Sequence, residues 1–148
     1  DDCGFKTLLG IETMGKVNQL GTLSEVLTLC KISKHFAPVV DFGHLNARDQ
    51  GILKATDDFK RIFDEIANTL GAEYAENLHC HFSKIMFTEM GEKKHLTFED
   101  DVYGPNFEPL AKAIVELGVS PTIICESAGT QSDDALMMKK IYEEALKN

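Results

Sequence analysis

The sequence predicts an α/β fold in which four strand–helix units follow one another around a parallel sheet. Short apolar runs alternate four times with longer amphipathic stretches, a pattern that is typical of parallel βα units. Each apolar run also ends on a carboxylate or lies beside an imidazole, as expected at the carboxyl edge of such a sheet. Four units make half of a (β/α)8 barrel, and we expect residues 1–148 to form a single domain.

Strands and helices are assigned from the period of the apolar residues. The predicted strands are 7–12, 38–41, 77–82 and 121–126. The predicted helices are 24–32, 57–70, 107–117 and 133–146. Helix caps are expected at Thr22, Gly71, Gly118 and Ser132. A Gly-rich loop spans 15–21, another loop follows Asp41, and the long loop 83–106 has the length of a functional segment.

Composition restricts the partners of the chain. The net charge of −9 and the pI near 4.9 argue against nucleic acid, which selects basic surfaces, unless carboxylates converge on bound cations. The sequence has no apolar run long enough to cross a membrane, so no membrane partner is expected. The cysteines have no CxxC spacing, which indicates structural thiols in a reducing, cytoplasmic compartment. They are Cys3, Cys30, Cys80 and Cys125.

The strand ends carry the chemistry that the sequence predicts. Each of the four predicted strands has a side chain that can bind a metal at its last or next-to-last residue. These side chains are Glu12, Asp41, His81 and Glu126. Because the carboxyl ends of parallel strands meet at one edge, we expect these side chains to converge. A single strand-end carboxylate commonly just caps a helix, whereas three carboxylates and an imidazole together favour a divalent metal, Zn²⁺ first and Mn²⁺ as the alternative.

Five segments resemble the successive motifs of the endonuclease IV (type 2 AP endonuclease) family, within the xylose-isomerase-like TIM-barrel superfamily. They are 11–13 (IET), 40–47 (VDFGHLNA), 78–83 (LHCHFS), 91–95 (GEKKH) and 123–127 (IICES). They occur in the family's order, and Asp-x-x-His-x-x-Ala is the most specific of them. The resemblance covers the fifth to eighth βα units of a TIM barrel and implies that the N-terminal half of the barrel is missing from this chain.

The resemblance also implies roles in a cluster of three zinc ions. Glu12 would bridge two metals, and Asp41, Glu126 and a histidine of the third predicted strand would complete the second metal. These three carboxylates are the expected catalytic residues. His79 and His81 both lie on that strand, and His81 is favoured because it is nearer the strand end and matches the His-Phe-Ser motif.

The third metal is expected to use His44 and His95, but the family pattern is incomplete there. The family has an aspartate two residues before the second histidine, and this chain has Lys93, which cannot act as a ligand. Three interpretations stay open: Glu92 substitutes for the aspartate, the third metal is absent, or the chemistry differs.

The function that the resemblance implies is metal-dependent phosphodiester hydrolysis at abasic or damaged DNA, with DNA bound by the full-length protein. Lys16 and Arg48 follow strand ends and are candidates for contacting a phosphate, although solvated loop charges are the commoner role. The alternative is a xylose-isomerase-like sugar isomerase or epimerase that uses one divalent metal, and a non-catalytic binding module is a third interpretation. With only part of the ligand set, the isolated chain is expected to have low activity.

Overall fold

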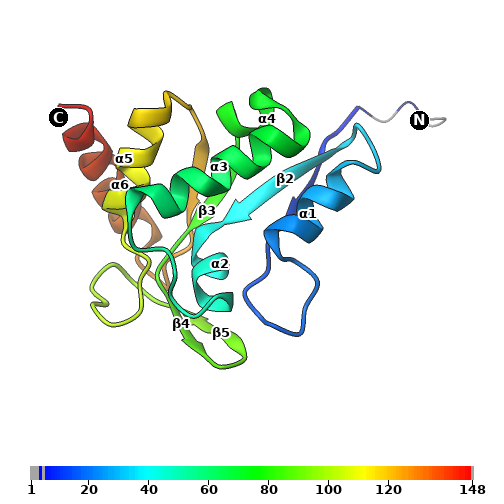
Figure 1. Ribbon diagram of the computed structural model, residues 1–148. Coiled ribbons are helices and arrows are strands. Elements are labelled where there is room, and N and C mark those ends of the chain that lie inside the picture. Colours follow the sequence, from blue (N-terminus) through cyan, green and yellow to red (C-terminus); the bar gives the residue numbers. More distant parts are fainter. Residues whose placement is uncertain (1–3, 5, 148) are drawn as a thin grey trace.

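A four-stranded parallel sheet forms the centre of the computed structural model, which describes residue 4 and residues 6–147 (Figure 1). Its strands are β1 (Leu9–Glu12), β2 (Phe36–Asp41), β3 (His79–Phe82) and β6 (Thr122–Cys125), in the order β1-β2-β3-β6. All neighbouring strands are parallel. The predicted α/β class with a parallel sheet is therefore confirmed, with strand ends that differ from the predicted ones by a few residues.

Four helices follow the strands, as the sequence predicts. They are α1 (Leu23–Cys30), α3 (Thr56–Leu70), α5 (Phe107–Leu117) and α6 (Gln131–Ala145). Thr22 caps α1 through a capping box with Glu25, and Gly118 ends α5 in the left-handed conformation with φ of 67°. The prediction that Ser132 caps the last helix is wrong. The chain enters the first turn of α6 at Thr130, whose carbonyl accepts a hydrogen bond from the Asp134 amide at 2.9 Å.

Two short helices were not predicted. The segment after Asp41 is not a loop but helix α2 (Phe42–Arg48), which begins where the Asp41 carboxylate accepts a hydrogen bond from the His44 amide at 2.8 Å. Helix α4 (Ala72–Glu76) directly follows α3 at Gly71. Both helices are too short for an apolar period to be visible in the sequence.

The long predicted loop 83–106 contains an antiparallel hairpin, which corrects the sequence interpretation. Strand β4 (Ile85–Thr88) pairs with β5 (Gly91–His95), and the register shifts within the hairpin. Phe87 pairs with Glu92 but Met86 pairs with Lys94, so Lys93 is the extra residue of a β-bulge. The hairpin extends beyond the carboxyl end of the sheet, at the same end as α2 (Figure 1).

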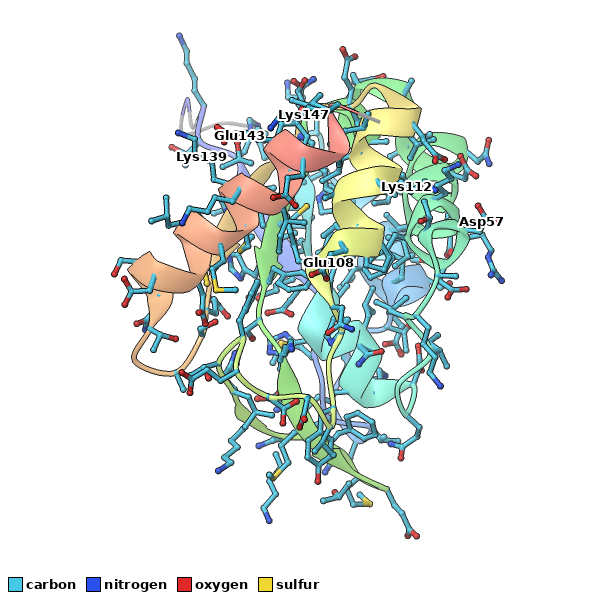
Figure 2. All side chains as sticks on the ribbon, turned by 90° about the vertical axis from the view of Figure 1, so that its left-hand side faces the viewer. Asp57, Glu108, Lys112, Lys139, Glu143 and Lys147 are labelled. Carbon is cyan, nitrogen blue, oxygen red and sulfur yellow. The ribbon has the colours of Figure 1, made fainter. Side chains whose placement is uncertain are left out.

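Charged side chains cover the outer surfaces of α3, α5 and α6 (Figure 2). Lys139 and Glu143 form an i,i+4 pair on α6 with a 3.8 Å separation, and such exposed pairs contribute little stability. Within the part of the chain that the structure describes, no helix is both long and apolar enough to cross a membrane.

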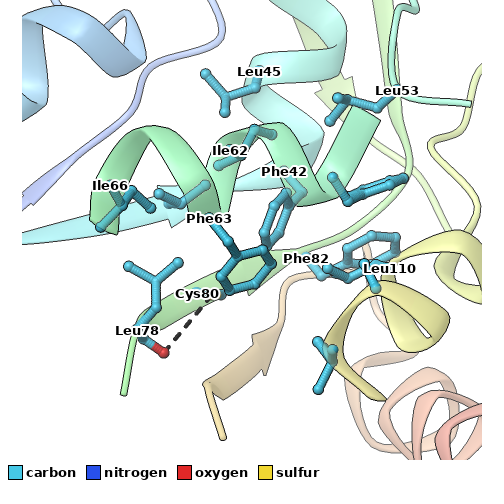
Figure 3. Close-up of a cluster of buried hydrophobic side chains, with 14 of the residues drawn as sticks. Phe42, Leu45, Leu53, Ile62, Phe63, Ile66, Leu78, Cys80, Phe82 and Leu110 are labelled. Atoms are coloured by element: carbon cyan, nitrogen blue, oxygen red, sulfur yellow. Dashed lines mark hydrogen bonds between the residues drawn. The ribbon is translucent and has the colours of Figure 1, made fainter. Parts of the chain in front are cut away.

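The hydrophobic core lies between the sheet and the helices α3, α5 and α6 (Figure 3). Val40, Cys80 and Phe82 point from β2 and β3 toward the helices and are fully buried. Side chains alternate along a strand, so Asp41, His79 and His81 point to the opposite face. Buried Cys80 and Cys30 behave as small apolar residues, since burial raises the pKa of both thiols, whereas Cys125 is half-buried and Cys3 lies outside the described residues.

Candidate metal centre

Four side chains meet at the carboxyl end of the parallel sheet, as the sequence predicts. Their potential ligand atoms all lie within 4.8 Å of one another. Asp41 and His81 are register partners in β2 and β3, and the Glu126 amide extends the β6 ladder by donating to the Phe82 carbonyl at 3.0 Å. We call this set the strand-end group: Glu12, Asp41, His81 and Glu126.

His81, and not His79, belongs to the strand-end group. The His81 Nδ1 atom lies 2.8 Å from Glu12 Oε1 and 3.3 Å from Glu126 Oε1. His79 lies two residues earlier on the same face, with its ring centroid 5.3 Å from that of His81, and its side chain is exposed. The register of β3 therefore brings the histidine nearer the strand end to the carboxylates.

Asp41 provides a direct test of whether the group suits a cation. Its side chain is fully buried, and Oδ1 accepts the His44 amide hydrogen bond. Across residues 6–147, its Oδ2 is the buried side-chain atom that finds no hydrogen-bond partner. Burial raises the pKa of this carboxyl group, because an uncompensated charge is costly in a low dielectric. A divalent cation would compensate that charge, so the residues present fit a metal.

A second set of potential ligands lies beside the first, and we call it the hairpin group: His44, Glu92 and His95. Glu92 Oε2 lies 3.6 Å from His44 Nε2, and Glu92 Oε1 lies 3.9 Å from His95 Nε2. The two imidazole rings are 5.5 Å apart, edge to face. One carboxylate between two imidazoles is a donor set that suits Zn²⁺.

The β-bulge explains how Glu92 reaches this position. Glu92 and His95 are three residues apart, so a regular strand would direct their side chains to opposite faces. The extra residue at Lys93 changes the phase of the strand and brings both side chains to the same side. The side chain of Lys93 itself is exposed. Of the three interpretations of the missing aspartate, this geometry agrees with substitution by Glu92.

Two further residues orient the imidazoles, and sequence reasoning did not single them out. The His44 Nδ1 atom lies 2.9 Å from the Thr13 carbonyl oxygen, which can only accept, so Nδ1 carries the proton and Nε2 is free to bind a metal. Ser83 is fully buried and its Oγ lies 2.8 Å from His95 Nδ1. Such partners of metal-binding histidines fix the ring orientation. The signal in the sequence was their place as the last residues of the segments 11–13 and 78–83, which carry the family resemblance.

The two predicted phosphate-contacting residues have different surroundings. Lys16 is exposed, and its backbone pairs with Gly91 of the hairpin. The guanidinium group of Arg48 donates hydrogen bonds to backbone carbonyls of the loop that follows β1. The contact of either residue with a phosphate stays a prediction.

Comparison with known proteins assigns the fold to a family. Residues 4–147 match the family described as the xylose isomerase-like TIM barrel, and the chain belongs to this family. The family is largely enzymatic and often uses divalent metals. The chain is also similar to the uncharacterized protein MJ0133 of Methanocaldococcus jannaschii, with 34% identity over 135 residues. That alignment covers 91% of this chain but 48% of the relative, so the chain spans about half the length of the curated relative it matches.

Proposed function

We propose that this chain carries the metal-binding half of a phosphodiester hydrolase that acts on abasic or damaged DNA. The observation that carries the proposal is the position of His44 between the two ligand groups. Its Nδ1 lies 3.5 Å from Asp41 Oδ2, and its Nε2 lies 3.6 Å from Glu92 Oε2. Adjacent metal sites are typical of enzymes that cleave phosphodiesters, because one metal stabilises the attacking oxygen and the other the leaving oxygen.

The residues would divide between two metals. The strand-end group would hold one ion and the hairpin group a second, with Zn²⁺ as the proposed metal and Mn²⁺ as the alternative. Bound metals would activate a water molecule and polarise the phosphoryl oxygen. Glu12 and Glu126 are half-buried, which leaves their carboxylates within reach of a substrate, whereas Asp41 is buried and holds its position through the His44 amide.

The whole enzyme would be a closed eight-stranded barrel. This chain contributes four parallel strands, and the relative MJ0133 is about twice as long as the segment aligned with this chain. Four preceding βα units would complete the barrel and add the remaining metal ligands. DNA binding would belong to that whole protein, and the isolated chain would show little nuclease activity.

A sugar isomerase or epimerase with one divalent metal is the second candidate. It is favoured by the strand-end group, which offers three carboxylates and an imidazole without any help from the hairpin. The net charge of −9 also suits a small neutral substrate better than a polyanion. The two proposals differ in the need for the hairpin group, because a single-metal isomerase does not require it.

Metal stoichiometry separates the two candidates. Elemental analysis of the purified chain saturated with Zn²⁺ should give about two ions per chain, since two ligand groups are present. His95→Ala should reduce the number to one, whereas His79→Ala should leave it unchanged, because His79 lies on the same sheet face outside both groups. One ion per chain in the unmodified protein, unaffected by His95→Ala, would contradict the nuclease proposal and favour the isomerase.

The substrate is tested on the barrel that includes the preceding half. A synthetic duplex with a single abasic site should be cleaved at that site, and a chelator should abolish the cleavage. Interconversion of an aldose and a ketose without any cleavage of the duplex would support the isomerase instead.

A further inference from the structure

Helix α2 directs two side chains toward the loop that follows β1. His44 and Arg48 are four residues apart and so lie on one face of the helix. His44 donates to the Thr13 carbonyl at 2.9 Å. The guanidinium group of Arg48 donates through Nη1 and Nη2 to carbonyls further along the same loop. These belong to Met14 (3.2 Å), Lys16 (2.8 Å), Val17 (3.2 Å) and Gln19 (3.0 Å).

The same loop is joined to the β4–β5 hairpin by its backbone. The Glu92 amide donates to the Gly15 carbonyl at 2.9 Å, and the Val17 amide donates to the Met90 carbonyl at 3.1 Å. These two hydrogen bonds flank the antiparallel bridge between Lys16 and Gly91. The backbone of the loop therefore fixes the backbone position of Glu92, which supplies the carboxylate of the hairpin group.

Close approach of the two segments requires glycine. A Cβ atom added to Gly15 would lie 2.6 Å from the Glu92 Cβ and 2.8 Å from its Oε2, closer than Cβ atoms in proteins approach other heavy atoms. Gly91 has a φ of 83°, and a side chain there would meet the Gly15 carbonyl oxygen. Loop and hairpin therefore form one unit against α2, and Glu92 packs directly on Gly15.

We propose that Arg48 is a positioning residue for the hairpin group, acting through the loop that follows β1. Its planar fork of donors holds several carbonyls at once, which a single ammonium group cannot reproduce. The ordered loop then holds the Glu92 amide, and Glu92 lies between His44 and His95. In this role the guanidinium group is occupied by the protein itself and does not bind the substrate phosphate. The inference rests on the proposed function in one respect, that the hairpin group binds a metal.

The experiment compares Arg48→Lys and Arg48→Gln with the matched control Arg61→Lys. Arg61 is an exposed arginine of α3 that pairs with the Asp58 carboxylate one turn earlier and donates a hydrogen bond to the Asp57 carbonyl. Hydrogen exchange of the protein in a chelator should show loss of protection at the Val17 and Glu92 amides in both Arg48 variants and none in the control. Gly15→Ala should produce the same loss at Glu92, since the added methyl group separates the two segments.

Zinc titration then measures the consequence for the metal centre. Loss of a residue that orients a metal ligand typically weakens affinity by about 10-fold to 100-fold, so Arg48→Lys should weaken one of the two zinc sites by this factor. The strand-end site should keep its affinity, because its ligands come from the sheet. A purely structural role would weaken both sites together.

The outcomes distinguish this inference from the proposed function. Protected amides and two unaltered zinc sites in Arg48→Lys would overturn the positioning role. A single zinc site in the unmodified chain would instead overturn the two-metal proposal, and the exchange experiment would still decide whether Arg48 holds the loop. Equal weakening of both sites in Arg48→Lys would also overturn the inference.

Discussion

Replacing the buried carboxylate Asp41 by asparagine tests the metal centre through protein stability. Asparagine has nearly the same shape, and its amide oxygen can still accept the His44 amide hydrogen bond that begins α2. What disappears is a buried charge whose Oδ2 accepts no hydrogen bond within the described part of the chain. In a chelator we therefore expect Asp41→Asn to be more stable than the unmodified chain at neutral pH.

The pH dependence follows from the direction of the pKa shift. Burial raises the pKa of Asp41 in the folded state, so between its unfolded and folded pKa values the native chain binds more protons than the unfolded chain. The stabilising contribution is present below the unfolded pKa, about 3.9, and is lost as the pH rises through the folded pKa. One proton corresponds to a slope of about −1.4 kcal/mol per pH unit in the free energy of unfolding.

Urea denaturation between pH 4 and 8, with and without Zn²⁺, measures these effects. In a chelator the difference between the two proteins should grow with pH and then level off. Added Zn²⁺ at about 100 times its dissociation constant should stabilise the unmodified chain by about 2.7 kcal/mol and Asp41→Asn by much less. Parallel pH curves in a chelator, or equal stabilisation by zinc, would refute the reasoning.

Two further predictions concern the bulge and the core. Lys93→Ala should leave zinc stoichiometry and affinity unchanged in a zinc titration, because the Lys93 side chain is exposed. Glu92→Gln should weaken one zinc site, because Glu92 belongs to the hairpin group. Loss of a zinc ion in Lys93→Ala would contradict this account of the bulge. Phe63 is 2% exposed and packs against Phe42 with ring centroids 6.1 Å apart. Phe63→Ala should therefore lower the free energy of unfolding by about 3–5 kcal/mol in urea denaturation, and Leu136→Ala on the surface by less than about 0.5 kcal/mol.

Local patterns account for the parts that the sequence predicted well. Helix α5 has its predicted ends because its apolar residues recur at helical spacing and Gly118 ends it in a conformation that glycine adopts readily. The strand-end group was predictable for a related reason. Parallel strands in consecutive βα units place their carboxyl ends at one edge, so the four strand-end residues had to meet once the units were recognised.

The hairpin group depends on contacts between segments that are far apart in the chain. Its carboxylate is supplied by Glu92 because of a bulge at Lys93, and no local pattern marks a bulge within the charged run 92–94. Among the described residues, the hairpin strands bridge to each other and to the loop near Gly15, and they lack the apolar alternation of a sheet strand, so the sequence predicts a loop there.

The sequence by itself determined the parallel α/β architecture and the side chains at its strand ends, because periodicity and chain order fix both. The tertiary structure places His81 rather than His79 among the carboxylates, as the sequence favoured, and it alone decided that Glu92 lies between His44 and His95. It also showed that Arg48 binds the loop after β1. These features depend on strand register and on contacts between distant segments, and neither is encoded in the neighbours of a residue along the chain.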